Sequence, residues 1–237
     1  MRRAAALLLF LSIAPAGAQA PAFEVASIRP SDYRGGPLRV TARIEADGVN
    51  FSNVTLRTCI QRAYGVAPYQ VVGPDWTATE RYMIVAKAGG PAPEAQIRRM
   101  LQPLLADRFK LVVHRESREI PVYGLVAPKG AGKLKAAALG DGATEIGEGD
   151  GGAIKFQRVS MDTLAGFLTR TLGRPVYNET RIDGAYDFQL AWAQGAEPSD
   201  APSIFTALGE QTGLKLEGRK APVEMLVIDR AERPSAN

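Results

Sequence analysis

The sequence predicts an α+β fold of two tandem related units, each with the order β-α-β-β-α-β-β and with helices packed on a largely antiparallel sheet. Three observations predict it. Residues 51–58 (FSNVTLRT) recur as residues 156–163 (FQRVSMDT), 105 positions later. Phe-Lys-Leu at 109–111 recurs as Leu-Lys-Leu at 214–216 with the same offset. Short alternating segments, typical of strands, lie close together between segments with a helical period. Such a repeat indicates that most apolar residues serve the core of a repeated structural unit, so few of them point to a functional site.

The first unit is predicted at residues 21–129. Thr55 is a suitable N-cap for its first helix, which ends at Gly65, and Glu94 opens its second helix. Apolar residues at spacings of three and four give each helix one buried face. The elements expected in chain order are strands at 23–28 and 38–44, the helix after Thr55, strands at 66–72 and 82–86, the helix from Glu94 through Leu105, and a hairpin of 109–114 and 120–127 that turns through 115–118.

Residues 130–152 are rich in Gly and acidic residues and show no sustained period, which predicts a linker or long loop. The second unit follows at residues 153–237. Its first helix begins after Ser160 and ends at Gly173, as in the first unit. The elements expected in chain order are a strand at 154–158, the helix after Ser160, strands at 175–177 and 186–192, a helix at 203–212, and a hairpin of 214–217 and 223–229.

Residues 1–20 have the three regions of a signal peptide: Arg2-Arg3, an apolar run at 4–14, and Ala-Gln-Ala at 18–20. We predict cleavage after Ala20 and a periplasmic or secreted protein. The alternative is an uncleaved anchor. The apolar run is shorter than the ~20 residues that span a bilayer, so no transmembrane segment is expected after cleavage.

Charge argues against a polyanionic partner. Cleavage removes two arginines and no acidic residue, so the net charge falls from +4 to +2. The remaining basic residues are interspersed with Asp and Glu, so nucleic-acid binding is not predicted. Cys59 is the only cysteine and lies on an apolar helical stripe, which predicts a buried thiol. The alternative is a disulfide to another chain.

Few residues carry recognisable chemistry. His114 is the only histidine, which excludes metal sites built on two imidazoles. On a strand it is expected to bond a carboxylate or the backbone, and the alternative is a general base oriented by Glu116. The acidic loop offers oxygen ligands for calcium as a further alternative to a solvated loop. These candidate ligands are Asp141, Glu145, Glu148 and Asp150. No cofactor is predicted.

Several passages together carry a family resemblance. They are residues 23–30 (FEVASIRP), 54–56 with 63–64, Gly73-Pro74 with Trp76 and 81–82, 108–109 with 114–116, 172–176 (LGRPV) with 184–188, and 222–229. With these passages nearly the whole chain after residue 20 resembles an uncharacterised family of secreted proteins from soil bacteria, the soil-associated protein family. Asn178 and Arg181 depart from the family's usual Asp and Gly. The family has no established activity, so the resemblance implies no catalytic residues.

A more distant similarity concerns residues 203–208 and 213–216, whose helix-Gly-strand pattern resembles the short N-terminal domain of secretins and TonB-dependent receptors. That domain docks proteins in the periplasm. Relatives of the soil-associated family also occur joined to membrane sensor-peptidases. Both similarities imply recognition or signalling, by analogy only.

The sequence therefore predicts an exported, non-catalytic module of the cell envelope that binds a protein or peptide or acts as a sensor. An exposed edge strand or the cleft between units would be the binding surface. The alternatives are a cell-envelope hydrolase that uses His114 with a carboxylate, and a sensor for small molecules or cell-wall fragments.

Overall fold

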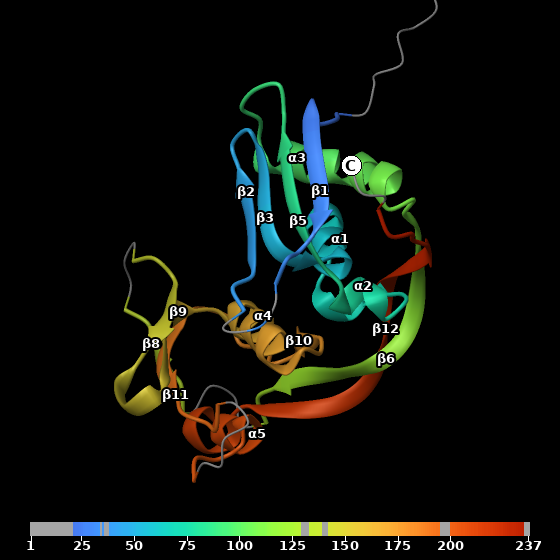
Figure 1. Ribbon diagram of the computed structural model, residues 1–237. Coiled ribbons are helices and arrows are strands. Elements are labelled where there is room, and N and C mark those ends of the chain that lie inside the picture. Colours follow the sequence, from blue (N-terminus) through green and yellow to red (C-terminus); the bar gives the residue numbers. More distant parts are fainter. Residues whose placement is uncertain are drawn as a thin grey trace, which may run out of the picture. The chain divides into compact units, whose positions relative to one another are not determined.

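A computed structural model describes residues 21–33, 35, 38–128, 133–138, 142–194 and 200–234. The chain forms two compact units (Figure 1). Unit 1 consists of residues 1–65, 74–112 and 229–237, and unit 2 consists of residues 66–73 and 113–228. Helices accompany sheets in which antiparallel pairing prevails, which confirms the α+β prediction.

Unit 1 contains one antiparallel sheet with the strand order β1-β5-β3-β2. These strands are β1 (Val25–Pro30), β5 (Arg81–Lys87), β3 (Gly48–Thr55) and β2 (Thr41–Glu45). Strands β1 and β2 are the edges. The core-facing residues of β3 and β5, such as Phe51 and Ile84, are fully buried. The alternation of apolar and polar residues thus separates a covered face from an open one.

Three helices complete unit 1, namely α1 (Leu56–Tyr64), α2 (Trp76–Thr79) and α3 (Glu94–Arg108). Helix α1 packs against α3. The buried helical residues recur at helical spacing, as predicted, and are Leu56, Cys59, Ile60, Ala63, Ile97, Met100, Leu101 and Leu105.

Unit 2 contains two sheets, ordered β10-β6-β12-β4 and β7-β11-β9-β8. The pairs β10/β6 and β12/β4 are parallel. The strands of both sheets are β4 (Val71–Val72), β6 (Val112–Val126), β7 (Lys135–Ala136), β8 (Glu145–Glu148), β9 (Ile154–Val159), β10 (Val176–Asn178), β11 (Tyr186–Leu190) and β12 (Lys215–Arg230). The helical segments are η1 (Pro68–Gln70), η2 (Asp150–Gly152), α4 (Met161–Leu172), α5 (Ile204–Ala207) and the π-helical turn η3 (Leu208–Thr212). Phe156, Leu164, Leu168 and Leu208 are central to its core.

The two predicted hairpins are wrong. Residues 109–127 form no turn at 115–118, because β6 is one strand of 15 residues. Residues 215–229 likewise belong to one strand of 16 residues, β12 (Lys215–Arg230). The charged segments that resembled turns lack the Asn-Gly or Asp-Gly pair of a tight hairpin, and pairing between β6 and β12 keeps both segments extended.

Smaller differences concern local elements. The predicted strand 66–72 is mostly the turn η1, because Pro68 stands at the first helical position and only Val71–Val72 pairs. Helix α2 was not predicted. The predicted linker 130–152 contains β7, β8 and η2 among its described residues.

The repeated passages share local geometry. Asn53 and Arg158, 105 positions apart, both have positive φ, of 55° and 52°, beside a shift in strand register. The following helices are capped by Thr55 and Ser160 and end at glycines with a left-handed backbone. A third helix, after Ser203, repeats the cap. The tandem arrangement itself is not confirmed, and the division at residues 129 and 152 stays a prediction.

Candidate functional site

Strand β1 presents an open edge. Ser31 donates its N–H to the Arg81 carbonyl at 2.8 Å, so Pro30 occupies a position whose backbone points away from β5. Since backbone direction alternates along a strand, the N–H and C=O groups of Ala26 and Ile28 also point outward. Proline is tolerated at such an edge position because it has no N–H to pair. No strand in the described part of the chain pairs with this side of β1.

Three neighbouring hollows with shared lining residues lie near β1, and we call them together the β1 groove. The first has a volume of about 300 Å³ and contacts Ala26. The middle hollow, of about 330 Å³, shares Asp107 and Arg108 with the first. The third, of about 300 Å³, shares Arg233 with the middle one and contacts Pro30. The outer two hollows therefore contact β1 at Ala26 and Pro30, and the middle hollow, which no residue of β1 lines, connects them.

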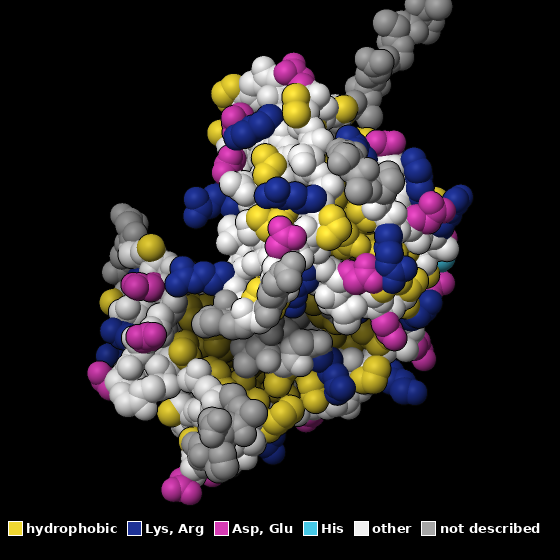
Figure 2. All heavy atoms as spheres, in the orientation of Figure 1, with side chains coloured by type: hydrophobic (Ala, Val, Ile, Leu, Met, Phe, Trp, Pro, Cys, Tyr) yellow, Lys and Arg dark blue, Asp and Glu magenta, His cyan; other side chains and the backbone are white. Residues whose placement is uncertain are grey.

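The first hollow is mainly apolar. Strand β1 and the segment before it form one wall, and the C-terminal half of α3 forms the other. Its apolar lining residues are Ala22, Phe23, Ala26, Met100, Pro103 and Leu104. On the face of the molecule that Figure 2 shows, hydrophobic side chains lie beside charged ones. An apolar hollow beside unpaired backbone groups suits an extended segment that binds through both.

Residues 231–234, which we call the C-terminal arm, form another wall of the groove. Glu232 donates its N–H to the Phe109 carbonyl at 2.6 Å. Arg233 Nε donates to both oxygens of Glu80, at 2.9 and 3.0 Å. The guanidinium also lies over the Trp76 ring, 5.1 Å from its centroid. A bidentate contact with a stacking ring fixes the arm more firmly than a single exposed ion pair would.

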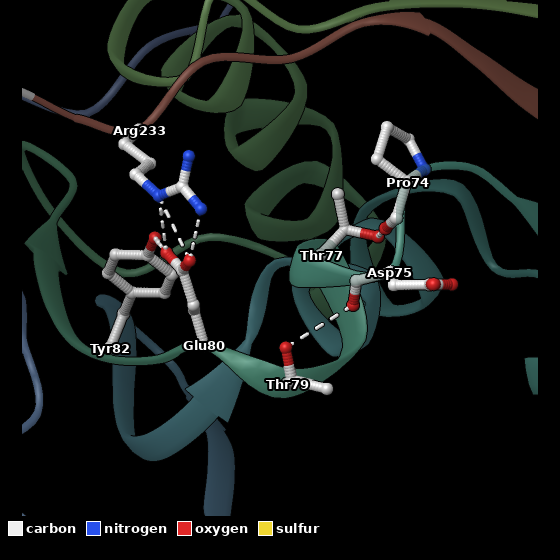
Figure 3. Close-up of polar contacts among 7 residues, drawn as sticks. All are labelled: Pro74, Asp75, Thr77, Thr79, Glu80, Tyr82 and Arg233. Atoms are coloured by element: carbon white, nitrogen blue, oxygen red, sulfur yellow. Dashed lines mark hydrogen bonds and ion pairs between the residues drawn. The ribbon is translucent and has the colours of Figure 1, made fainter.

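The carboxylate of Glu80 is contacted by both Arg233 and Tyr82 (Figure 3). The Tyr82 hydroxyl donates to Glu80 Oε2 at 3.1 Å, and the Arg233 guanidinium holds the pKa of the Glu80 carboxyl below its usual range. Burial, and then the bond to Glu80, raise the pKa of Tyr82 to about 12. The turn before Glu80 is held by Thr77, whose hydroxyl donates to the Pro74 carbonyl at 2.6 Å. These groups therefore position the arm.

The raised pKa of Tyr82 predicts sensitivity to alkali. Folding disfavours the phenolate, so its contribution to stability is complete below pH 10 and is lost as pH rises toward 12. We expect the free energy of unfolding, measured with urea at pH 8 and 11, to fall less in Tyr82→Phe than in the wild type. Tyr177→Phe, which changes an exposed ring, should keep the full fall. Equal falls in wild type and Tyr82→Phe would contradict the prediction.

His114 and Glu116 are neighbours on β6, as predicted for alternate residues of a strand. His114 Nε2 lies 3.5 Å from Glu116 Oε2, and their side chains are 47% and 36% exposed. Arg118 also pairs with this carboxylate and is the main cause that lowers the pKa of Glu116. Neither His114 nor Glu116 lines the β1 groove. The general-base hypothesis stays a prediction. His114, Glu116 and Arg118 alternate along β6 and form a row of exposed polar side chains.

A half-exposed imidazole contributes little to folding. We expect His114→Ala to change the free energy of unfolding by less than about 0.5 kcal/mol, the usual range for surface substitutions. Urea denaturation at pH 7 measures this change. If the free energy of unfolding fell by more than about 1 kcal/mol, the imidazole would have a structural role that its surface position does not predict.

The calcium candidates are only partly described. Asp141 lies outside the described residues, while Glu145 and Glu148 are on β8 and Asp150 is in η2. Glu145 and Glu148 are three positions apart on a strand, so their side chains lie on opposite faces. Within the described ranges, no three His, Cys, Asp or Glu side chains gather closely enough to hold a metal ion. The calcium hypothesis stays a prediction.

Cys59 is completely buried, as predicted, and burial raises the pKa of its thiol to about 12. The thiol therefore has a structural role in the core of unit 1. The contact between Glu80 and Arg233 was not predicted, because 153 positions separate them and neither belongs to a local motif. Pro30 was the one available signal for the open edge of β1.

Comparisons with known proteins place the chain in a family. Among the described residues, no helix is long and apolar enough to cross a membrane. No curated protein and no solved structure matches the chain. The finer resemblances, to soil-associated proteins and to the secretin and TonB domain, stay predictions. Residues 57–231, about three quarters of the chain, match the family described as "Protein of unknown function (DUF3738)", and the chain belongs to that family.

Proposed function

We propose that this protein is exported and binds an extended segment of a cell-envelope protein or peptide, without catalysis, by adding it to the edge of β1. One observation carries the proposal: β1 is an edge strand with outward backbone groups, and the β1 groove contacts it at Ala26 and at Pro30. In strand addition, main-chain hydrogen bonds supply affinity, and hollows for alternate side chains supply specificity.

The dimensions suit a short peptide. Strand β1 has six residues, and at about 3.3 Å per residue it is roughly 20 Å long. Each of the three hollows is at the lower end of the range for small-molecule sites, roughly 300–1,000 Å³. They hold a few side chains in a row better than one compact ligand. This favours a peptide over the alternative of a small-molecule sensor.

The hydrolase alternative keeps one observation, the 3.5 Å contact between His114 and Glu116. Two features weigh against it as the main function. The carboxylate that would orient the imidazole is shared with Arg118, and both side chains of the pair are well exposed. Binding at β1 needs no such pair, so we place it first.

The test of strand addition is Ala26→Pro. This change removes the outward N–H of Ala26 and adds a ring at the edge, while the pairing with β5 keeps its hydrogen bonds. A random displayed library of eight-residue peptides is selected on residues 21–237, and affinities of the enriched peptides are measured by fluorescence anisotropy. We expect Ala26→Pro to weaken them at least tenfold, about 1.4 kcal/mol.

Ala136→Pro is the matched control. Ala136 is exposed on β7, an edge strand of unit 2, and its neighbour Ala137 donates its N–H to the Ala185 carbonyl at 2.8 Å. By the same alternation, the N–H of Ala136 points outward. Ala136→Pro should leave peptide affinity unchanged. Peptides that bind Ala26→Pro as tightly as the wild type would refute strand addition at β1.

Export is proposed from residues 1–20, which lie outside the described residues. Its support is the pattern of Arg2-Arg3, the apolar run and the Ala-Gln-Ala before residue 21. Expression in a Gram-negative host, followed by osmotic release and mass spectrometry, should give a periplasmic chain that begins at Pro21. A full-length chain in the cytoplasm would refute the proposal.

A further inference from the structure

The β1 groove also indicates what side chains a bound segment carries, an inference that rests on the proposed strand addition. Every strand pair in the sheet of unit 1 is antiparallel. An added strand therefore completes the sheet best when it runs antiparallel to β1. Its residues then meet β1 in reverse order, so the one opposite Ile28 comes two positions before the one opposite Ala26.

The position opposite Ala26 selects an apolar side chain. Residues that face one another across two strands place their side chains on the same face of the sheet. The side chain of Ala26 lines the first hollow together with Phe23, Met100 and Leu104. A side chain the size of leucine opposite Ala26 would enter this hollow. Its apolar surface would then be removed from water, which favours binding.

The position opposite Ile28 selects an acidic side chain. Ile28 stands between Ala26 and Pro30, and the middle hollow, which no residue of β1 lines, connects the hollows that contact these two residues, so this position is placed beside the middle hollow. The described lining of the middle hollow contains three basic residues, Arg108, Lys110 and Arg233, against two acidic ones, Asp107 and Glu232.

The ion pairs of these residues indicate which basic residue a bound acidic side chain would contact. Glu232 pairs with Arg230, and Arg233 pairs with Glu80. Asp107 is shared between Arg108 and Lys110, at 3.4 and 3.7 Å, both longer than a good hydrogen bond. A further carboxylate beside Lys110 would therefore improve the charge balance of the hollow. Its ammonium is accessible, since the side chain is 56% exposed.

We propose that the partner presents an extended segment with the pattern acidic-x-apolar, read from N- to C-terminus, whose carboxylate pairs with Lys110 and whose apolar side chain fills the hollow at Ala26. Lys110 is then a specificity-determining residue. The partner is a protein or peptide with this segment exposed in an unpaired strand or tail.

The probe is a seven-residue peptide with capped ends. It contains glutamate, then one threonine, then leucine, and all its other residues are threonine. Three companion peptides replace glutamate by lysine, replace leucine by serine, or exchange the two. Affinities are measured by isothermal titration calorimetry on purified residues 21–237. We expect each companion to bind at least tenfold more weakly than the probe.

Charge reversal identifies the contact. In Lys110→Glu, the lysine peptide should bind more tightly than the glutamate peptide, which reverses the preference of the wild type. Lys155→Glu, an exposed change on β9 of unit 2, should keep the wild-type preference. Lys110→Gln, which is neutral, should lose the preference and keep binding, so a folding defect of one variant does not decide the result.

The outcomes separate the two proposals. Equal affinity for the glutamate and lysine peptides, with both abolished by Ala26→Pro, would overturn the acidic preference and leave strand addition standing. Binding that survives Ala26→Pro would refute strand addition itself. No binding of the probe at 1 mM, roughly the weakest affinity worth assigning, would overturn the pattern. A dimer seen by sedimentation velocity and abolished by Ala26→Pro would assign the edge to a second copy instead.

Discussion

Phe109→Ala is expected to lower the free energy of unfolding by about 3–5 kcal/mol, the range for removing a large buried aromatic ring. Phe109 is fully buried at the end of α3. Its ring meets Tyr82 edge-on, with 5.1 Å between the ring centroids. The substitution leaves a cavity below Tyr82, whose hydroxyl bonds Glu80. Urea denaturation at pH 7 measures the loss.

The matched control for Phe109→Ala is Phe205→Ala. Phe205 is 42% exposed on α5 and packs edge-on against Tyr123, so truncation should cost about 0.5–1.5 kcal/mol. A second effect distinguishes the two sites. Because the Phe109 carbonyl and Glu80 both hold the C-terminal arm, Phe109→Ala should speed hydrogen exchange at the Glu232 amide, and Phe205→Ala should not. Equal losses of stability would contradict the assignment of Phe109 to the core.

Gly48→Ala is expected to have the next largest effect. Gly48 begins β3 directly after the turn from β2 and pairs with Lys87. A Cβ at this position would lie 2.1 Å from the carbonyl oxygen of Ala86. The obstacle is backbone of a central strand, so it cannot rotate away as a side chain would. We expect a loss near the upper end of overpacking effects, about 3 kcal/mol.

Gly90→Ala is the control for this prediction, since a Cβ at Gly90 would meet no atom within 4 Å. It should be neutral or slightly stabilising, because alanine restricts the unfolded chain. The denaturation midpoints of both variants are compared with the wild type under the same conditions. If Gly48→Ala were as stable as Gly90→Ala, the close approach of β3 to β5 at this point would be wrong.

The helices α1, α4 and α5 were predictable because their signals are local. The caps Thr55, Ser160 and Ser203 each accept from the backbone N–H three residues on, and glycines end the same helices, so a few neighbouring residues decide each boundary. The strands β6 and β12 were not predictable in the same way. Their charged central residues resemble turns in isolation, and only the long-range pairing between them explains why they stay extended.

The candidate site was predictable only in part. Residues 23–28 were expected as a strand and the residues from Glu94 as a helix, and an edge strand was expected to bind the partner. Which strand is an edge depends on sheet order, which no short segment encodes. The position of the C-terminal arm was even less predictable from local sequence. Arg233 contacts Glu80 and Trp76 only because the chain returns to unit 1 at residue 229.

That return has a consequence for how the protein is made. Unit 1 contains both the first described residues of the chain and residues 229–234, and the whole of unit 2 is synthesised between them. Glu80, Trp76 and the Phe109 carbonyl therefore gain these partners only after residues 232 and 233 have been synthesised. One wall of the β1 groove is completed only when residues 231–234 have been made, so a shorter chain would expose the edge of β1 to other unfolded chains.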